Sequence, residues 1–175
     1  MRVVLMMVST INGRITKGTT SVDIQEWASG EDQELFYGTL KKQKLVVMGS
    51  KTYDAARDFM EFRPGQLRVV MTRTPKRYGK HVRPGQLEFT SATAQKLVEE
   101  YAKKGYTQLF LVGGGEINAL FFKAKLIDEI LLTIEPFIFG NGKSLIAEGS
   151  FEEKFKLASV KKLNKRGTLL LKYVR

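Results

Sequence analysis

The sequence predicts one α/β domain, residues 1–175, built on a mixed, mostly parallel sheet that helices cover on both faces. Three observations support this class. Strand-like apolar segments alternate with helix-like segments over much of the chain, as in a parallel sheet. The last two strand-like segments flank the turn formers Asn164–Gly167, which predicts a closing antiparallel hairpin. No linker-like composition divides the 175 residues.

Eight segments are predicted strands because they are rich in β-branched and large apolar residues and are bounded by turn formers. The last two also alternate apolar and polar residues, which is typical of the strands of a hairpin. In chain order the predicted strands are residues 2–9, 44–50, 67–73, 87–91, 108–114, 128–139, 154–163 and 167–175.

Three segments have the apolar spacing of helices. Residues 30–42 place Leu35, Phe36 and Leu40 on one side. Residues 93–105 have an apolar side at Leu97, Val98 and Tyr101, and Gly105 supplies the C-terminal stop. Residues 116–126 form the third helix and follow three consecutive glycines.

Composition restricts the possible functions. The chain has no cysteine, which excludes disulfides and thiol chemistry and fits a reducing compartment. A single histidine, His81, excludes a histidine-cluster metal site, and we expect no metal. No segment resembles a signal peptide or reaches membrane-spanning length, so we expect a cytoplasmic protein with no membrane partner.

The formal net charge of +11 favours an anionic partner. Nucleic acid is disfavoured, because no zinc-finger, helix-turn-helix or RNA-binding aromatic motif accompanies the basic residues. A small anionic ligand fits the charge better.

Gly113, Gly114 and Gly115 stand between a predicted buried strand and a predicted helix. Such a junction offers bare backbone N–H groups and the positive end of a helix dipole to an anion. The alternative is a tight turn with close packing of helix on sheet. The dinucleotide fingerprint G-x-G-x-x-G fails, because Asn118 stands where the third glycine belongs.

Two other glycine-containing motifs are predicted turns. The segment Gly140–Ser144 ends like a P-loop, but Phe137 replaces the first glycine of that motif. The pentapeptide RPGQL occurs at Arg63–Leu67 and at Arg83–Leu87, each time directly before a strand. The same turn chemistry used twice explains this better than a duplication.

Four motifs in succession resemble the dihydrofolate reductase superfamily, which includes the reductase domain of the riboflavin-biosynthesis deaminase-reductase. They are VVMGSKTYD, RPGQLRVVMTR, LFLVGGGEINALFF and DEILLTIEPFIFGNG, and the opening LMMVSTINGRIT is similar to that reductase domain. The resemblance covers nearly the whole chain. It implies a three-layer dihydrofolate reductase-like fold with an eight-stranded sheet, and NADPH as the hydride donor.

The resemblance also implies the cofactor contacts. Gly113–Gly115 would line the pyrophosphate, with a strained peptide bond between two glycines. The family's G-x-K-T stretch, at the end of the second strand, and its S/T-R pair, at the end of the third, would hold phosphates. With the neighbouring positions, the implied cofactor-binding residues are Val8, Ile15, Gly49, Ser50, Lys51, Thr52, Thr72, Arg73, Gly113, Gly114, Gly115, Glu116 and Ile117.

The resemblance implies, as the preferred function, a dihydrofolate reductase activity, with Asp32 as the carboxylate that orients the pterin and Thr133 as its support. Asp32 and Phe36 are one helical turn apart and can face one pocket. The register also allows Glu31 as the carboxylate. The arginine that grips the folate tail is replaced by Gln66, with Arg68 only nearby. The implied pocket wall comprises Met6, Met7, Trp27, Phe36 and Phe59.

The first alternative is the riboflavin-pathway reduction of a ribosylaminopyrimidinone 5′-phosphate. Lys41 and Arg63, or else Arg57, would then hold the substrate's phosphate. Against it, that branch carries a glutamate where this chain has Gly113, and its aspartate-rich stretch after the second strand is missing. Either substrate is a small heterocycle.

The second alternative is a basic nucleotide-binding module without catalysis. The apolar closing strands leave both a monomer and a homodimer open.

Overall fold

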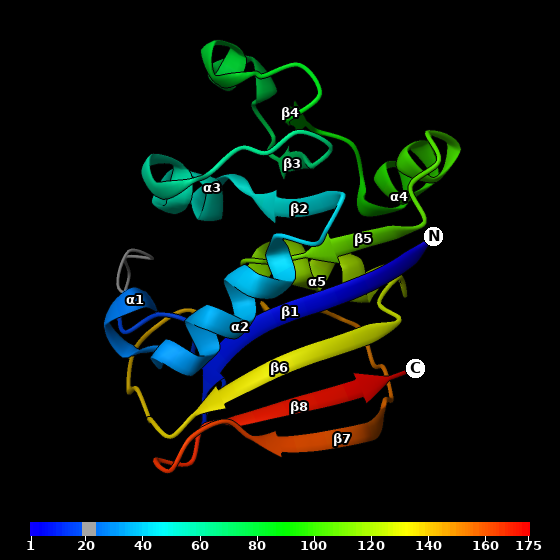
Figure 1. The fold of residues 1–175 in the computed structure, drawn as a ribbon. Helices are drawn as coiled ribbons and strands as arrows, with labels where there is room; N and C mark the ends of the chain where they lie inside the picture. Colours follow the sequence, from blue (N-terminus) through cyan, green and yellow to red (C-terminus); the bar gives the residue numbers. More distant parts are fainter. Residues whose placement is uncertain (19–23) are drawn as a thin grey trace.

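An eight-stranded sheet runs through the computed structural model, which describes residues 1–18 and 24–175 (Figure 1). Its order is β4-β3-β2-β5-β1-β6-β8-β7. Strands β1 to β6 pair in parallel, whereas β8 is antiparallel to β6 and β7, so the predicted mixed sheet and closing hairpin are confirmed. The strands are β1 (Arg2–Thr10), β2 (Leu45–Gly49), β3 (Leu67–Met71), β4 (Leu87–Thr90), β5 (Gln108–Leu111), β6 (Glu129–Glu135), β7 (Lys156–Lys162) and β8 (Leu169–Val174).

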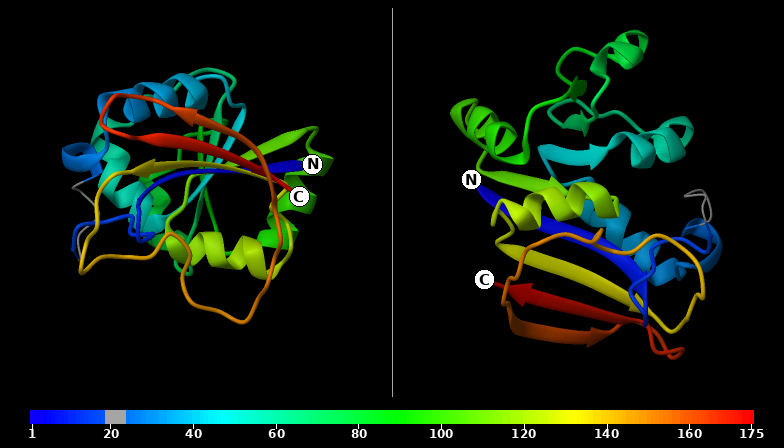
Figure 2. Two further views of the ribbon diagram at one scale, coloured as in Figure 1. Left: turned by 90° about the horizontal axis from the view of Figure 1, so that it is seen from below. Right: turned by 180° about the vertical axis from the view of Figure 1, so that it is seen from behind.

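Helices cover both faces of the sheet. In Figure 1, α2 crosses in front of the sheet, and the view from behind in Figure 2 shows α5 across the opposite face. Apolar residues of α2 and α3 join one cluster with the sheet, and those of α4 and α5 join the other. The helices are α1 (Ile24–Trp27), α2 (Gly30–Leu40), α3 (Ser50–Ala56), α4 (Ala94–Lys103) and α5 (Gly115–Lys123), with 3-10 helices η1 (Arg57–Phe59) and η2 (Pro75–His81).

The central strands divide their side chains between the two clusters. In β2, Val47 belongs to the α4/α5 side and Val46 to the α2/α3 side, and both are fully buried. In β3, Val69 and Val70 divide in the same way. Successive residues of a strand point to opposite faces, so near-continuous apolar runs fit a sheet that is covered on both sides.

Local sequence signals fix the helix starts and the strand entries. Ser29 caps α2 by accepting a hydrogen bond from the Asp32 N–H at 3.3 Å, and Thr93 caps α4 in the same way. Both RPGQL segments make one turn type. Gly65 and Gly85 have φ of +76° and +71°, a region that glycine adopts without strain. The prediction of one turn chemistry used twice is confirmed.

The structure corrects several predicted boundaries. Strand β5 ends at Leu111 rather than at residue 114. The segment Ser50–Thr52, expected at the end of a strand, instead begins helix α3. Thr72 and Arg73 lie just beyond β3, which ends at Met71. Strand β6 ends at Glu135 rather than at residue 139, because the next residue is Pro136, which has no N–H to donate to a sheet.

Within residues 1–18 and 24–175, no helix is long enough and apolar enough to cross a membrane.

Candidate active site

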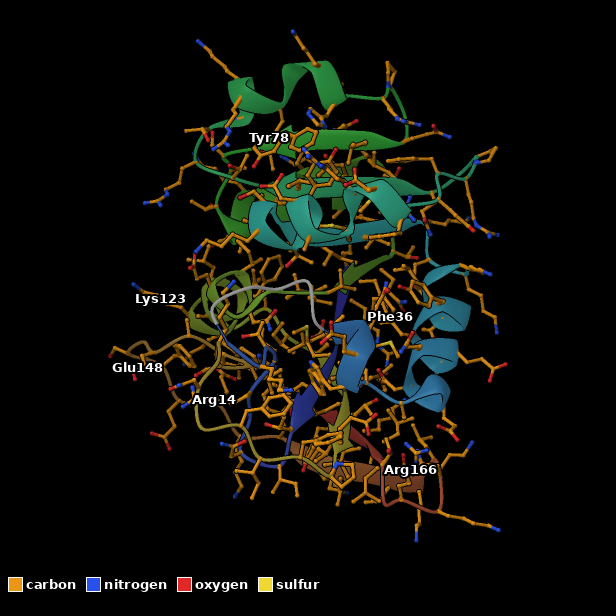
Figure 3. All side chains as sticks on the ribbon, turned by 90° about the vertical axis from the view of Figure 1, so that its left-hand side faces the viewer. Arg14, Phe36, Tyr78, Lys123, Glu148 and Arg166 are labelled. Carbon is orange, nitrogen blue, oxygen red and sulfur yellow. The ribbon has the colours of Figure 1, made fainter. Side chains whose placement is uncertain are left out.

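A large cavity begins at the edge of the sheet where the parallel strands end and reaches residues at the end of α2 and the start of β3. Residues at the carboxyl ends of β1 to β5 line it, which is the usual position for ligands in open α/β sheets. Its volume of about 1590 Å³ exceeds the ~300–1,000 Å³ typical of a site for one small ligand. Figure 3 views the molecule from this side and places Phe36 of α2 near its centre. The cavity therefore has room for two ligands.

The N-terminus of α5 forms one wall of this cavity. Gly114, Gly115, Glu116 and Ile117 all line it, so the helix dipole presents its positive end there. The peptide bond between Gly113 and Gly114 is cis. Gly113 itself is buried and does not line the cavity, which differs from its predicted role in cofactor binding.

Close packing explains two of the three glycines. A Cβ on Gly113 would lie 2.7 Å from the Met7 sulfur, and one on Gly115 would collide with the Ser144 carbonyl oxygen. A Cβ on Gly114 would meet only ordinary contacts. The close-packing interpretation therefore holds for Gly113 and Gly115, and anion binding at this junction stays a prediction. The outer glycines allow tight packing, and the first turn of α5 is brought to the cavity.

Basic side chains gather around this helix end. Lys51 donates a hydrogen bond to Glu116 at 2.7 Å, and this contact holds the pKa of Glu116 below its usual value. Arg73 and Lys143 are close enough to lower that pKa further. All four side chains line the cavity. We call the three basic residues of this group, Lys51, Arg73 and Lys143, the ledge cations.

Asp32 is the buried carboxyl group of the cavity, with 5% of its surface exposed. Burial raises the pKa of Asp32 to about 6, and the charge of Glu135 adds to the rise. The Thr133 hydroxyl lowers that pKa in part, although it makes no hydrogen bond of good geometry within the described residues. Thr133 is itself buried and does not line the cavity.

Glu135 is a second buried carboxylate beside Asp32, and sequence reasoning missed it. Its two oxygens accept hydrogen bonds from the Ser29 N–H at 2.8 Å and from the Thr168 hydroxyl at 2.7 Å. It is only 2% exposed. A carboxylate at the end of the mostly apolar strand β6 was a signal for it, since buried charges need partners.

The other predicted carboxylate, Glu31, points elsewhere. It is exposed, and it accepts a hydrogen bond from Asn164 at 3.1 Å, outside the cavity. Between the two carboxyl groups that the sequence left open, the structure therefore places Asp32 in the cavity. This follows from the helical geometry of α2, since successive residues point about 100° apart.

Trp27 is also outside the cavity, contrary to its predicted place in the pocket wall. It packs in a small apolar cluster with Val8 and Ala28, and its ring meets that of Phe139 edge-on at 5.4 Å. The short helix α1 turns it inward. A large apolar side chain fits a pocket wall and a hydrophobic core equally well, so the sequence did not show which of the two places Trp27 takes.

A second group of cations lies where α2 ends and β3 begins. Lys41, Arg63 and Arg68 all line the cavity there, and all three influence the exposed carboxylate of Glu61. Arg57 does not line the cavity, so of the two arginines considered for a phosphate the structure brings only Arg63 to it. Arg68 was noticed in the sequence but assigned no role.

Most of the predicted site residues meet in this cavity. Those outside it are Gly113, Trp27, Glu31 and Thr133. Those that line it are Asp32, Met6, Met7, Val8, Ile15, Phe36, Lys41, Gly49, Ser50, Lys51, Thr52, Phe59, Arg63, Thr72, Arg73, Gly114, Gly115, Glu116 and Ile117.

Comparison with known families gives one match over most of the chain. A family model described as the RibD C-terminal domain matches residues 2–169. An uncharacterized protein, YwjB of Bacillus subtilis (strain 168), is 25% identical in an alignment of 177 residues. The alignment covers 99% of this chain and 98% of that protein.

Solved structures share the fold. A putative riboflavin biosynthesis protein from Shewanella sp. PV-4 has a TM-score of 0.76 at 20% identity, covering 100% of this chain and 99% of that one. A pyrimidine reductase-like protein from Corynebacterium diphtheriae has a TM-score of 0.75 at 12% identity, covering 99% and 91%. A deaminase/reductase from Thermotoga maritima has a TM-score of 0.72 at 15% identity; 99% of this chain matches 56% of that protein.

Proposed function

Because the chain belongs to the RibD C-terminal domain family, we propose that it is an NADPH-dependent reductase of the ribosylaminopyrimidinone 5′-phosphate of riboflavin biosynthesis. One observation carries the proposal. A single stretch of cavity holds two groups of cations, the ledge cations at α5 and a second group at the end of α2. A phosphorylated cofactor and a phosphorylated substrate would each meet one group.

The residues at the ledge fit a dinucleotide phosphate. The first turn of α5 supplies N–H groups and a positive dipole for a diphosphate. Arg73, just beyond β3, is exposed toward the cavity and suits a 2′-phosphate. NADPH, when bound, would supply a hydride to the carbon of a C=N bond, while a proton goes to the nitrogen.

The second group of cations would hold the substrate. Lys41 follows the C-terminus of α2, and Arg63 opens the turn before β3, so rigid elements position both side chains. Phe36 and Met6 offer apolar surface for a flat heterocycle between the two groups. Asp32 faces the same space, and burial raises its pKa to about 6.

Dihydrofolate remains the second candidate substrate because of Asp32. A buried carboxyl group on the first long helix is what a pterin reductase uses to orient its substrate. Against it, Gln66 stands where the arginine for the folate tail was expected, and both of its amide hydrogens are engaged. They are donated to the carbonyl oxygens of Leu40 at 2.8 Å and Gln43 at 2.7 Å.

Turnover with both substrates side by side tests the proposal. Loss of NADPH absorbance is followed with the ribosylaminopyrimidinone 5′-phosphate, with dihydrofolate and with neither. We expect oxidation of NADPH only with the first. Oxidation with dihydrofolate alone would favour the second candidate, and none with either substrate would contradict both.

A further inference from the structure

Arg68 is a buried guanidinium without a counter-charge. It lies on β3, on the face that α2 covers, and only 4% of the residue is exposed. Its side chain makes no hydrogen bond and no ion pair with any residue in 1–18 or 24–175, and its Nη1 atom is shielded from solvent without a partner. Buried arginines are normally paired, because removing a charge from water is costly.

The surroundings of Arg68 make its charge less favourable. Burial lowers its pKa, and the neighbouring Arg63 lowers it further. Among the described residues, Glu61 is the carboxylate that acts on the pKa of Arg68, and it is exposed and already accepts a hydrogen bond from Arg63 at 2.8 Å. The Phe62 ring lies over the guanidinium at 5.1 Å, but an aromatic face does not replace an anion.

We propose that Arg68 is the innermost ligand of an anion subsite, with Arg63 and Lys41 at its rim, that receives the phosphomonoester of the substrate. Arg68 lines the same cavity as the other two, and all three cations are close enough to lower the pKa of Glu61, which places them around one point of the cavity. A guanidinium binds phosphate through two parallel N–H donors, and a buried one does so without competition from water. Identifying the anion as the substrate's 5′-phosphate rests on the proposed function; the subsite itself rests on the geometry.

A purely structural role for Arg68 predicts different behaviour. If its contact with Phe62 were what matters, replacing Arg68 would destabilise the fold. Arg83 offers a matched comparison, because its guanidinium lies over the same ring at 4.2 Å but does not line the cavity. An unpaired buried charge that awaits a ligand predicts the reverse: its removal leaves stability unchanged or higher and weakens anion binding.

The experiment compares Arg68→Met with Arg83→Met, with ribose 5-phosphate as the probe and ribose as its uncharged counterpart. Calorimetric titration gives the dissociation constants and thermal unfolding gives the stability. The same measurements are repeated with Arg73→Met added to every protein. This removes the arginine of the ledge cations, so that binding of the phosphate at the ledge does not mask binding at Arg68. We expect Arg68→Met to raise the dissociation constant for ribose 5-phosphate at least tenfold with Tm unchanged or higher, and Arg83→Met to leave it within about twofold.

Wild-type affinity in Arg68→Met would overturn the proposal, and so would equal losses in the two variants. If Arg68→Met does not fold, Arg68→Lys is the deciding variant, because lysine keeps the positive charge but lacks the two parallel N–H donors of the guanidinium. We then expect severalfold weaker binding of ribose 5-phosphate at an unchanged Tm. Unchanged binding would refute the subsite. Absence of NADPH turnover, with the effect of Arg68→Met on ribose 5-phosphate binding intact, would reject the proposed reaction and retain the subsite.

Discussion

At the scale of single residues, the burial of Asp32 lowers the free energy of unfolding at neutral pH. Its pKa is about 6 in the folded protein, against a usual value near 3.8. In the unfolded chain the group therefore ionises at lower pH than in the folded protein. Stability from this group is intact below about pH 4 and is lost as the pH rises through about 6.

We therefore expect Asp32→Asn to stabilise the protein at pH 8 by about 2–3 kcal/mol, since one pKa unit corresponds to about 1.4 kcal/mol. The gain should disappear near about pH 3, below the usual pKa of 3.8, where Asp32 is protonated in both states. Urea unfolding at the two pH values measures it. An equal effect at both pH values would show that the pKa of Asp32 is not raised.

Lys41 tests the substrate end of the cavity. We expect Lys41→Ala to raise the apparent KM for the phosphorylated substrate about tenfold while kcat changes little, because the lost contact is made equally in the ground and transition states. Lys42→Ala is the matched control, since Lys42 follows directly but lies outside the cavity. Steady-state kinetics decide. Equal effects of both variants would point to general electrostatics.

Asp32→Asn separates the two candidate substrates. With the ribosylaminopyrimidinone 5′-phosphate we expect little change in kcat, whereas a pterin reductase would lose most of its activity with its orienting carboxylate. Turnover of the variant with each substrate, at saturating NADPH, makes the comparison. A large loss with the riboflavin intermediate would assign Asp32 a direct part in that reaction.

Residue types and spacing were enough to predict where the cavity lies, but not which nearby residues line it. Asp32 and Phe36 were correctly predicted to face one pocket, because helical spacing determines which side chains share a face. Trp27 and Gly113 were misplaced, since whether an apolar or small residue lines a pocket depends on elements distant in sequence. The burial of Arg68 was likewise not evident from its residue type.

At the scale of elements, the glycines that join β5 to α5 differ from the glycine inside α2. A Cβ on Gly115 would collide with a backbone oxygen, that of Ser144, which cannot move aside cheaply. Gly38 of α2 has nothing within 4 Å of an added Cβ. The same substitution should therefore have opposite signs in the two helices.

We expect Gly115→Ala to lower the free energy of unfolding by about 2–4 kcal/mol through overpacking. Gly38→Ala should raise it by about 0.5–1 kcal/mol, because alanine loses less backbone entropy in a helix interior. Chemical denaturation of both variants measures the difference. Tolerance of Gly115→Ala would mean that α5 is free to shift away from the loop that carries Ser144.

Long apolar strands were the elements that the sequence predicted best, because burial on both faces leaves an unambiguous run. Helix α3 was missed because Ser50–Ala56 is only seven residues long and contains Thr52, Tyr53 and Asp54, which are weak helix formers. Its place is set by tertiary packing, since Tyr53 is buried against Tyr78 and Phe89.

At the scale of the whole molecule, the net charge of +11 can be tied to the cavity. The ledge cations and the group of Lys41, Arg63 and Arg68 line the cavity itself. A strongly basic chain attracts any polyanion at long range, however, and the specific contacts must discriminate among them. Selectivity for a dinucleotide phosphate is therefore the property that separates a reductase from a general basic binding module.

We expect NADPH at 100 times its dissociation constant to stabilise the protein by about 2.7 kcal/mol, which is roughly 5–10 °C in Tm for a chain of this size. NADH at the same concentration should shift Tm less, because it lacks the 2′-phosphate that Arg73 would contact. Higher salt should weaken both effects. Thermal unfolding with NADPH, with NADH and with a single-stranded RNA measures the shift in Tm that each ligand causes. A shift with RNA but none with NADPH would contradict the reductase proposal and favour a nucleic-acid-binding module, because the same basic surface would then act without the selectivity of the ledge.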